Sequence, residues 1–61
     1  MNNIQDLRQR KGLSQAELAQ RVGVDPSAVS KWESAGIYPK STLLPKIADA
    51  LDCKIDEIFG R

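Results

Sequence analysis

The sequence lacks histidine altogether and has a single cysteine, Cys53, among its 61 residues. One thiol permits no internal disulfide bond, and one thiol without imidazole cannot supply the ligands of a structural zinc site. No apolar run approaches the roughly 20 residues that span a bilayer, and no basic segment precedes an apolar one at the N-terminus. We therefore expect a cytoplasmic domain without a membrane segment, metal or other cofactor.

Groups that perform catalysis are also scarce. Without histidine there is no nucleophile–base pair, and no glycine-rich loop is present to cradle phosphates. Asp56 and Glu57 are adjacent acids that suit the first turn of a helix, where the helix dipole favours them, rather than two sides of a substrate. We expect neither enzyme activity nor a small-molecule ligand.

The length predicts one domain over residues 1–61. A chain of this size buries only about 60% of its unfolded surface, so its stability is marginal. The net charge is +1, but residues 1–48 hold seven bases and four acids, whereas residues 49–61 hold two bases and four acids. A basic body with an acidic end allows a polyanion to bind on one side, although an ordinary solvated surface explains the charge more simply.

Apolar residues recur at helical spacing through most of the chain, with almost no strict alternation. This pattern predicts an all-α fold of five short helices. The first is expected over Ile4–Lys11 and is stopped by Gly12 in a left-handed conformation. The second starts at Ser14, whose spacing to Glu17 fits a capping box, and it ends at Gly23.

The other three helices have weaker boundaries. The third is expected from Asp25-Pro26 to about Ser34, because Asp caps helices and Pro suits the first helical position. The fourth starts between Ser41 and Leu43. If Thr42 is its cap, Pro45 falls within the first turn at little cost, whereas an earlier start forfeits a hydrogen bond. The fifth covers Ile55–Phe59 and begins after Lys54, which is a poor cap.

The most informative stretch covers about residues 15–34. Two helices of about eight residues are joined by the three residues Gly23-Val24-Asp25, and so short a link forces the sharp angle of a helix-turn-helix. Ala19 is small enough for close approach of the helices, and glycine tolerates a positive φ at the turn. Val24 and Val29 fill the wedge between the helices.

Several segments together resemble the lambda-repressor and Cro type of helix-turn-helix, also called the xenobiotic-response-element (XRE) family. They are Leu13–Ala19, Gly23-Val24, Val29–Glu33, Leu43–Leu51 and Ile55–Phe59. The resemblance extends over roughly residues 4–59. It implies a five-helix domain that binds double-stranded DNA and lays its third helix in the major groove.

The sequence departs from the family pattern at three places, which concern the helix ends and the residues that would read bases. Asp52 stands where the family usually has glycine, so we expect the fourth helix to end less cleanly. Lys54 replaces the usual Ser or Thr cap. Pro26, Ser27 and Ala28 replace the longer polar side chains of many phage repressors, so the resemblance does not specify which bases are read.

On the third helix, the side away from Val29 and Trp32 is expected to meet the bases. The predicted base-facing residues are Pro26, Ser27, Ala28, Ser30 and Lys31. Lys31 is the main candidate for a specific contact, as a donor to guanine O6 or N7; a solvated surface lysine is the alternative. Pro26 and Ala28 would touch a thymine methyl group.

The resemblance also implies contacts to the DNA backbone at the start of the second helix and around the loop after the third. The predicted phosphate contacts are Ser14, Gln15, Ser34, Tyr38, Lys40 and Ser41. For Gln15 the helix N-terminus would assist. For Tyr38 and Lys40 an ordinary loop position is an equally open alternative.

Three further residues receive structural roles. The resemblance to phage repressors implies an ion pair of Arg8 with Glu33 that joins the first and third helices. Trp32 is expected in the core, because proteins that stack on single strands interleave several exposed aromatics with bases. Cys53 is expected to be buried or half-buried, since no basic cluster surrounds it to lower the pKa of its thiol.

The last helix has more apolar surface than a small edge helix needs. Ile55, Ile58 and Phe59 are its apolar residues, and those that do not complete the core predict a two-fold homodimer through this end. Two recognition helices would then lie about 34–36 Å apart, one turn of duplex.

These patterns indicate a sequence-specific transcriptional regulator, most simply a repressor that binds a near-palindromic operator as a dimer. We expect it to be bacterial or phage-encoded and associated with the nucleoid. The alternative is a DNA-binding antitoxin whose main partner is a toxin protein, for which 61 residues leave little room.

Overall fold

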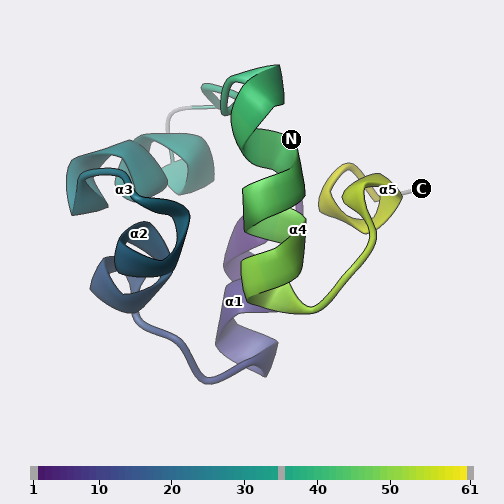
Figure 1. Ribbon diagram of the computed structural model, residues 1–61, viewed down its shortest axis with the longest axis horizontal. Coiled ribbons are helices and arrows are strands. Elements are labelled where there is room, and N and C mark those ends of the chain that lie inside the picture. Colours follow the sequence, from purple (N-terminus) through teal and green to yellow (C-terminus); the bar gives the residue numbers. More distant parts are fainter. Residues whose placement is uncertain (1, 35, 61) are drawn as a thin grey trace.

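The computed structural model describes residues 2–34 and 36–60. Within them, every regular element is helical, which confirms the expected all-α fold. The elements are α1 (Ile4–Arg10), α2 (Gln15–Val22), α3 (Pro26–Ser34), the 3₁₀ turn η1 (Ser41–Leu43), α4 (Leu44–Leu51) and α5 (Ile55–Ile58). Figure 1 shows α2 and α3 on one side of the central α4, and α5 on the other.

The predicted start and end of α2 are confirmed in detail. The Glu17 backbone N–H donates to Ser14 Oγ at 3.0 Å, and the Ser14 N–H donates to Glu17 Oε1 at 2.9 Å, so both halves of the capping box form. Gly23 ends the helix with a φ of 86°. Before α2, the chain turns at Gly12, whose φ is 72°, and α1 ends at Arg10, one residue earlier than expected.

The fourth helix begins later than the sequence indicated. Residues Ser41–Leu43 form a 3₁₀ turn, and the α-helix begins only at Leu44. Pro45 then occupies the first turn, where its missing N–H would have had no intrahelical acceptor. The start is uncapped by any side chain, so Pro45 and the preceding 3₁₀ turn define it.

The end of α4 is clean, contrary to expectation. Asp52 takes the left-handed conformation that glycine would take, with φ 53° and ψ 48°. The next amide, that of Cys53, donates to the Ala48 carbonyl at 2.9 Å. The aspartate therefore ends the helix as glycine would, although an L side chain is strained in this region of φ/ψ space.

Helix α5 is a single turn, one residue shorter than predicted. The lysine before it has no side-chain acceptor, as expected of a poor cap. Instead Glu57 reaches back, and its Oε2 accepts from the Lys54 backbone N–H at 3.1 Å.

The core draws on every α-helix. Its buried apolar residues are Ile4, Leu13, Leu18, Ala19, Val22, Val29, Trp32, Ile47, Ala48, Leu51 and Ile58. Trp32 is 5% exposed, which confirms its expected place in the core. Ile58 is wholly buried, so it completes the core and is not available to a dimer contact; of the three predicted interface residues, only Ile55 and Phe59 reach the surface.

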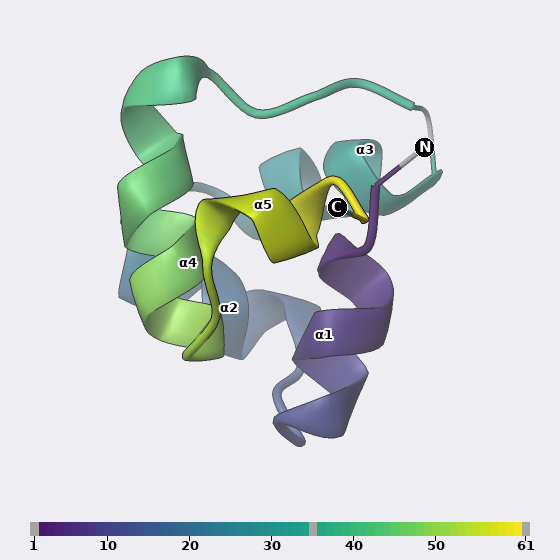
Figure 2. The ribbon, with the colours of Figure 1, turned by 90° about the vertical axis from the view of Figure 1, so that its right-hand side faces the viewer.

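The N-terminal segment ties three helices together. Asn2 accepts from the Ile4 N–H at 3.0 Å and donates to the Trp32 carbonyl at 3.1 Å, so it serves the start of α1 and the last turn of α3. The Asn3 N–H donates to the Ile58 carbonyl at 2.7 Å. The start of the chain and α5 consequently lie side by side, as Figure 2 shows.

Candidate nucleic-acid interface

Helices α2 and α3 have the close packing that a helix-turn-helix requires. Ala19 is 1% exposed and Val29 is wholly buried, so the small residue and the wedge residue lie where the sequence predicted. The amides of Gly23 and Val24 both donate to the Ala19 carbonyl, at 2.8 and 2.9 Å. This paired bond fixes the left-handed turn from which α3 departs.

The outer side of α3 displays short polar side chains and one cation. Pro26, Ser27 and Lys31 are exposed, and Ser30 is half-buried. Ala28 differs, because it is half-buried and packs against the core. Only part of its surface therefore remains for a base contact.

Ser34 closes the same helix with an internal bond. Its Oγ donates to the Ser30 carbonyl at 2.8 Å. A hydroxyl has a single hydrogen, so in this conformation Ser34 presents only acceptor lone pairs to its surroundings. Phosphate oxygens also accept, and the predicted phosphate contact would require this hydroxyl to rotate.

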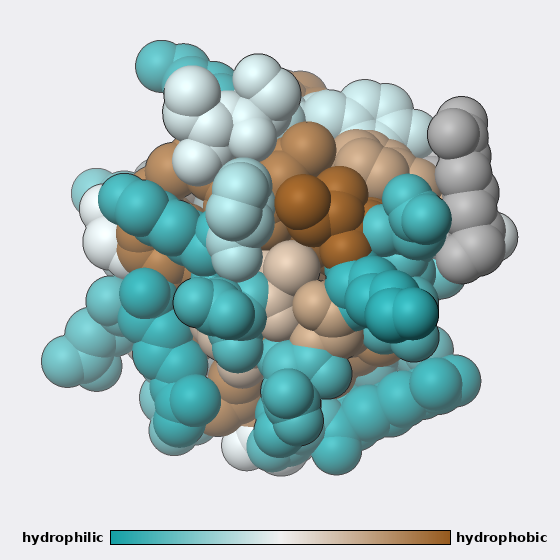
Figure 3. All heavy atoms as spheres, turned by 45° about the vertical axis from the view of Figure 1, so that its right-hand side comes forward, coloured by the Kyte–Doolittle hydropathy of each residue, from teal (hydrophilic) through white to brown (hydrophobic). Residues whose placement is uncertain are grey.

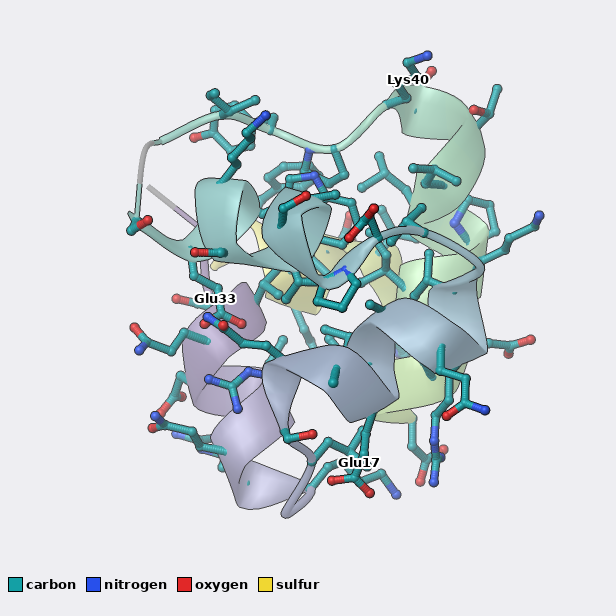
Figure 4. All side chains as sticks on the ribbon, turned by 90° about the vertical axis from the view of Figure 1, so that its left-hand side faces the viewer. Glu17, Glu33 and Lys40 are labelled. Carbon is teal, nitrogen blue, oxygen red and sulfur yellow. The ribbon has the colours of Figure 1, made fainter. Side chains whose placement is uncertain are left out.

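A buried polar cluster holds the other end of α3 to the rest of the protein. Arg8 donates two hydrogen bonds to Glu33, from Nε to Oε2 at 2.7 Å and from Nη2 to Oε1 at 3.1 Å. Its third bond runs from Nη1 to the Leu13 carbonyl at 2.7 Å, and Gln15 Nε2 donates to Glu33 Oε1 at 3.0 Å. We call these four residues the Glu33 cluster; Figure 4 shows Glu33 where α3 comes nearest to α1.

The two charged side chains of the Glu33 cluster are shielded from solvent. The Glu33 side chain is 2% exposed and the Arg8 side chain 11%. Hydrogen bonding to Glu33 raises the pKa of the Arg8 guanidinium, with burial acting in the opposite direction. Each partner of this enclosed pair hydrogen-bonds the other, which offsets the cost of removing both from water. The ion pair implied by the family resemblance therefore forms, joined by Gln15.

That bond defines how Gln15 presents its amide. A carboxylate only accepts, so the amide nitrogen must face Glu33. The nitrogen carries a second hydrogen, which remains for an external acceptor next to the start of α2. Ser14 is exposed beside it. The arrangement fits the predicted phosphate contact of Gln15.

The loop after α3 presents both charge and apolar surface. Lys40 and Ser41 are exposed, and Figure 4 shows Lys40 extending away from the body of the protein. Tyr38 is 50% exposed, and its ring centroid lies 5.6 Å from that of Phe59. This contact turns part of Tyr38 towards α5.

Sequence reasoning missed Ile37, which is 51% exposed. It borders an open groove of about 630 Å³ between α3 and the loop, lined by Val24, Ala28, Trp32, Ile37, Tyr38 and Leu43 among others. The available signal was an isoleucine in a segment with glycine and proline on either side, where no helix would bury it.

Cys53 is half-buried, as expected. Burial raises the pKa of its thiol, and the nearby carboxylates of Glu57 and Asp52 raise it further. The thiolate is the reactive form, so this environment disfavours redox chemistry at neutral pH. Within residues 2–34 and 36–60, no helix is long and apolar enough to cross a bilayer.

These features define a class of protein. A short helix, fixed at one end by a glycine turn and at the other by a buried ion pair, projects serines and a lysine outward. Such a helix fits the major groove of DNA, which admits an α-helix. The domain is a helix-turn-helix of the DNA-binding kind.

Comparison with known proteins gives the family. The profile described as helix-turn-helix matches residues 4–58, and the chain belongs to this family, in its XRE-type branch of transcriptional regulators. The cryptic phage CTXphi transcriptional repressor RstR of Vibrio cholerae is 42% identical over 55 residues, 87% of this chain. The transcriptional activator BcrR of Enterococcus faecalis is 40% identical over 57 residues, 93% of this chain.

A third relative is the uncharacterized helix-turn-helix regulator YgzD of Bacillus subtilis, 34% identical over 58 residues, or 95% of this chain. The match covers 88% of YgzD, but only 49% of RstR and 28% of BcrR. The chain thus spans about half or less of the length of two of these relatives.

Proposed function

We propose that the chain binds double-stranded DNA in a sequence-specific way and represses transcription by occupying promoter DNA, in the cytoplasm and on the nucleoid. The observation that carries this proposal is the outer face of α3, held in a fixed orientation by the Glu33 cluster. One relative is named a repressor and another an activator, so repression is the simpler mode rather than the sole mode in the family.

The proposed contacts follow the geometry. Lys31 is the main base-reading residue, since it is the one cation among the exposed residues of α3. Ser27 and Ser30 donate or accept and therefore discriminate weakly between bases. Gln15 and Lys40 contact the backbone on either side and position α3 in the groove.

We further propose that the operator is near-palindromic and that two copies bind it. Ile55 is 38% exposed and Phe59 is partly exposed, so α5 keeps apolar surface that the core does not use. A two-fold dimer through this end places two recognition helices about 34–36 Å apart. It also adds stability that a 61-residue core lacks.

The test is selection from a random duplex DNA library at near-physiological salt. Enrichment of an inverted repeat with half-sites one helical turn apart supports a dimeric, sequence-reading regulator. Binding that is salt-sensitive and unselective contradicts it, and would instead favour an antitoxin that mainly binds a toxin protein.

A further inference from the structure

The Glu33 carboxylate accepts hydrogen bonds from two different helices. Its Oε2 accepts from Arg8 Nε, whereas its Oε1 accepts both from Arg8 Nη2 and from Gln15 Nε2. Arg8 belongs to α1 and Gln15 is the first residue of α2, so one side chain of α3 is bonded to both. The ion pair with Arg8 is enough to join α3 to α1, and the bond to Gln15 adds a separate contact.

The side-chain amide of Gln15 has two ends of nearly the same shape and opposite chemistry. Its oxygen only accepts hydrogen bonds, whereas its nitrogen carries two hydrogens and only donates. Packing by itself distinguishes these two ends poorly, because they are so similar in size. The Glu33 carboxylate does distinguish them, since it only accepts and therefore selects the orientation in which Gln15 Nε2 faces it.

The selected orientation determines what Gln15 offers to an anion outside the protein. One hydrogen of Nε2 is bonded to Glu33, and the other is left for an acceptor beside the start of α2. If the amide turned over, an oxygen lone pair would replace that second hydrogen and would repel a phosphate oxygen. Gln15 is half-buried, so its side chain reaches Glu33 on one side and solvent on the other.

We propose that Glu33 is a positioning residue for DNA binding, because it orients the Gln15 amide so that Nε2 donates to a phosphate of the DNA backbone. The proposal rests on the proposed DNA binding and adds the group that makes Gln15 a donor there. The Glu33 side chain is 2% exposed, so it acts through Gln15 rather than by touching DNA. This role is separate from the ion pair of Glu33 with Arg8.

Two substitutions of nearly unchanged shape test the positioning. In Glu33→Gln, the amide oxygen is expected to stay with Arg8 Nε, which makes the shorter of the two bonds, so that the NH₂ group faces Gln15 and favours the reversed amide there. Gln15→Met removes the amide and keeps the length of the side chain. We expect each variant to bind a short DNA duplex about tenfold more weakly than the wild type, measured by fluorescence anisotropy.

The double variant separates positioning from a purely structural role. If Glu33 acts through Gln15, Glu33→Gln has no further effect on DNA affinity once residue 15 is methionine, and the double variant binds as Gln15→Met does. If Glu33 only fixes the orientation of α3, the loss from Glu33→Gln recurs in the methionine background, which overturns the proposal. Thermal melting ensures that all variants are compared at a temperature where each is folded.

Lys40→Met is the matched control background. Lys40 is also proposed to contact phosphate, and Figure 4 shows it on a different part of the protein from Glu33. Effects of distant sites add, so Glu33→Gln should weaken DNA binding by the same factor with Lys40 present or replaced. A Glu33→Gln effect that disappears in the Lys40→Met background as well would contradict a specific coupling to Gln15.

A measurement on the wild-type protein does not depend on the folding of any variant. The two hydrogens of Gln15 Nε2 give separate NMR signals, and saturation with the duplex should shift the signal of the hydrogen that does not face Glu33. Two unchanged signals overturn the proposal.

The duplex in these experiments has an arbitrary sequence, because phosphate contacts carry no sequence information directly. The two proposals can therefore fail separately. A library selection that enriches no site counts against sequence-specific regulation and leaves the coupling of Glu33 to Gln15 standing. Additive losses in the double variant overturn that coupling and leave sequence reading by α3 untouched.

Discussion

Two regions of the protein differ in whether their side chains are satisfied within the chain. In one region, the Glu33 cluster encloses two charges, and Arg8 and Glu33 are bonded to each other within the chain. In the loop after α3 and in α5, Ile37, Tyr38 and Ile55 are between 38% and 51% exposed. The charges of the Glu33 cluster are therefore satisfied within one copy of the chain, whereas the loop and α5 keep apolar area exposed to solvent. Figure 3 shows hydrophobic atoms at the surface on the α5 side of the protein.

The difference has a physical origin and a functional meaning. A buried charge must be satisfied inside the chain, because leaving it unpaired costs several kcal/mol. Exposed apolar area carries a milder penalty and remains available for association. The orientation of α3 therefore depends on contacts within this chain, and the proposed second copy would set only the separation of two such helices.

The largest effect on stability is expected in the Glu33 cluster. Glu33→Ala leaves the Arg8 guanidinium buried without its partner and should lower the free energy of unfolding by about 3–5 kcal/mol. A 61-residue domain has only about 3–9 kcal/mol in total, so much of the variant would be unfolded. Thermal and urea unfolding measure this, with Glu33→Gln as the milder, isosteric comparison. An unchanged melting temperature would show that the cluster is dispensable.

Within α5, two isoleucines should behave differently. Ile58 is wholly buried and Ile55 is 38% exposed. Ile58→Ala should lower the free energy of unfolding by about 2–5 kcal/mol through a core cavity, and Ile55→Ala should lower that of the monomer by less than about 1 kcal/mol. Urea unfolding at low protein concentration compares the two variants, and equal losses of stability would contradict the difference in burial between the two isoleucines.

On the outer face of α3, Lys31→Ala should weaken operator binding by about 1–3 kcal/mol and relax the preference at one base pair. Stability should be unchanged, since Lys31 is exposed. Binding to a set of single-base operator variants provides the measurement. An equal loss on every sequence would make Lys31 a phosphate contact instead.

A smaller effect of opposite sign is expected where α4 ends. Asp52→Gly removes the backbone strain of an aspartate in the left-handed conformation. It should raise the free energy of unfolding by up to about 1 kcal/mol. The substitution also removes an exposed ion pair with Lys11, 3.4 Å between Nζ and Oδ2, which contributes little. Asp52→Ala is the control, because it removes the carboxylate and keeps the strain. Greater stability of the alanine variant than of the glycine variant would contradict the argument.

The smallest effect concerns acid stability at the start of α2. Hydrogen bonds from the Ser14 backbone and hydroxyl lower the pKa of Glu17 in the folded protein. The resulting stabilisation is present above the unfolded pKa, near 4.5, and disappears as pH falls through the lowered folded pKa. Melting of the wild type should therefore fall more between pH 5 and 3 than melting of Glu17→Gln. Parallel pH curves would exclude this contribution.

Local signals in the sequence determined most of the helix boundaries and the helix-turn-helix. The Ser14–Glu17 capping box and the glycine at Gly23 act over three or four residues, so their spacing alone predicts what they do. The family resemblance added the pairing of Arg8 with Glu33, which are 25 residues apart and which no local rule connects. The resemblance did not predict the hydrogen bond from Gln15 to Glu33.

The sequence by itself determined the five α-helices, the turn between α2 and α3, and which side of α3 faces outward, because these depend on contacts within one or two helical turns. Only the tertiary structure decided that Ile58 enters the core while Ile55 does not, that Ile37 stays exposed, and that Tyr38 lies against Phe59. Those outcomes depend on how α5 and the loop are placed against distant helices, and burial is a property of that placement rather than of residue type.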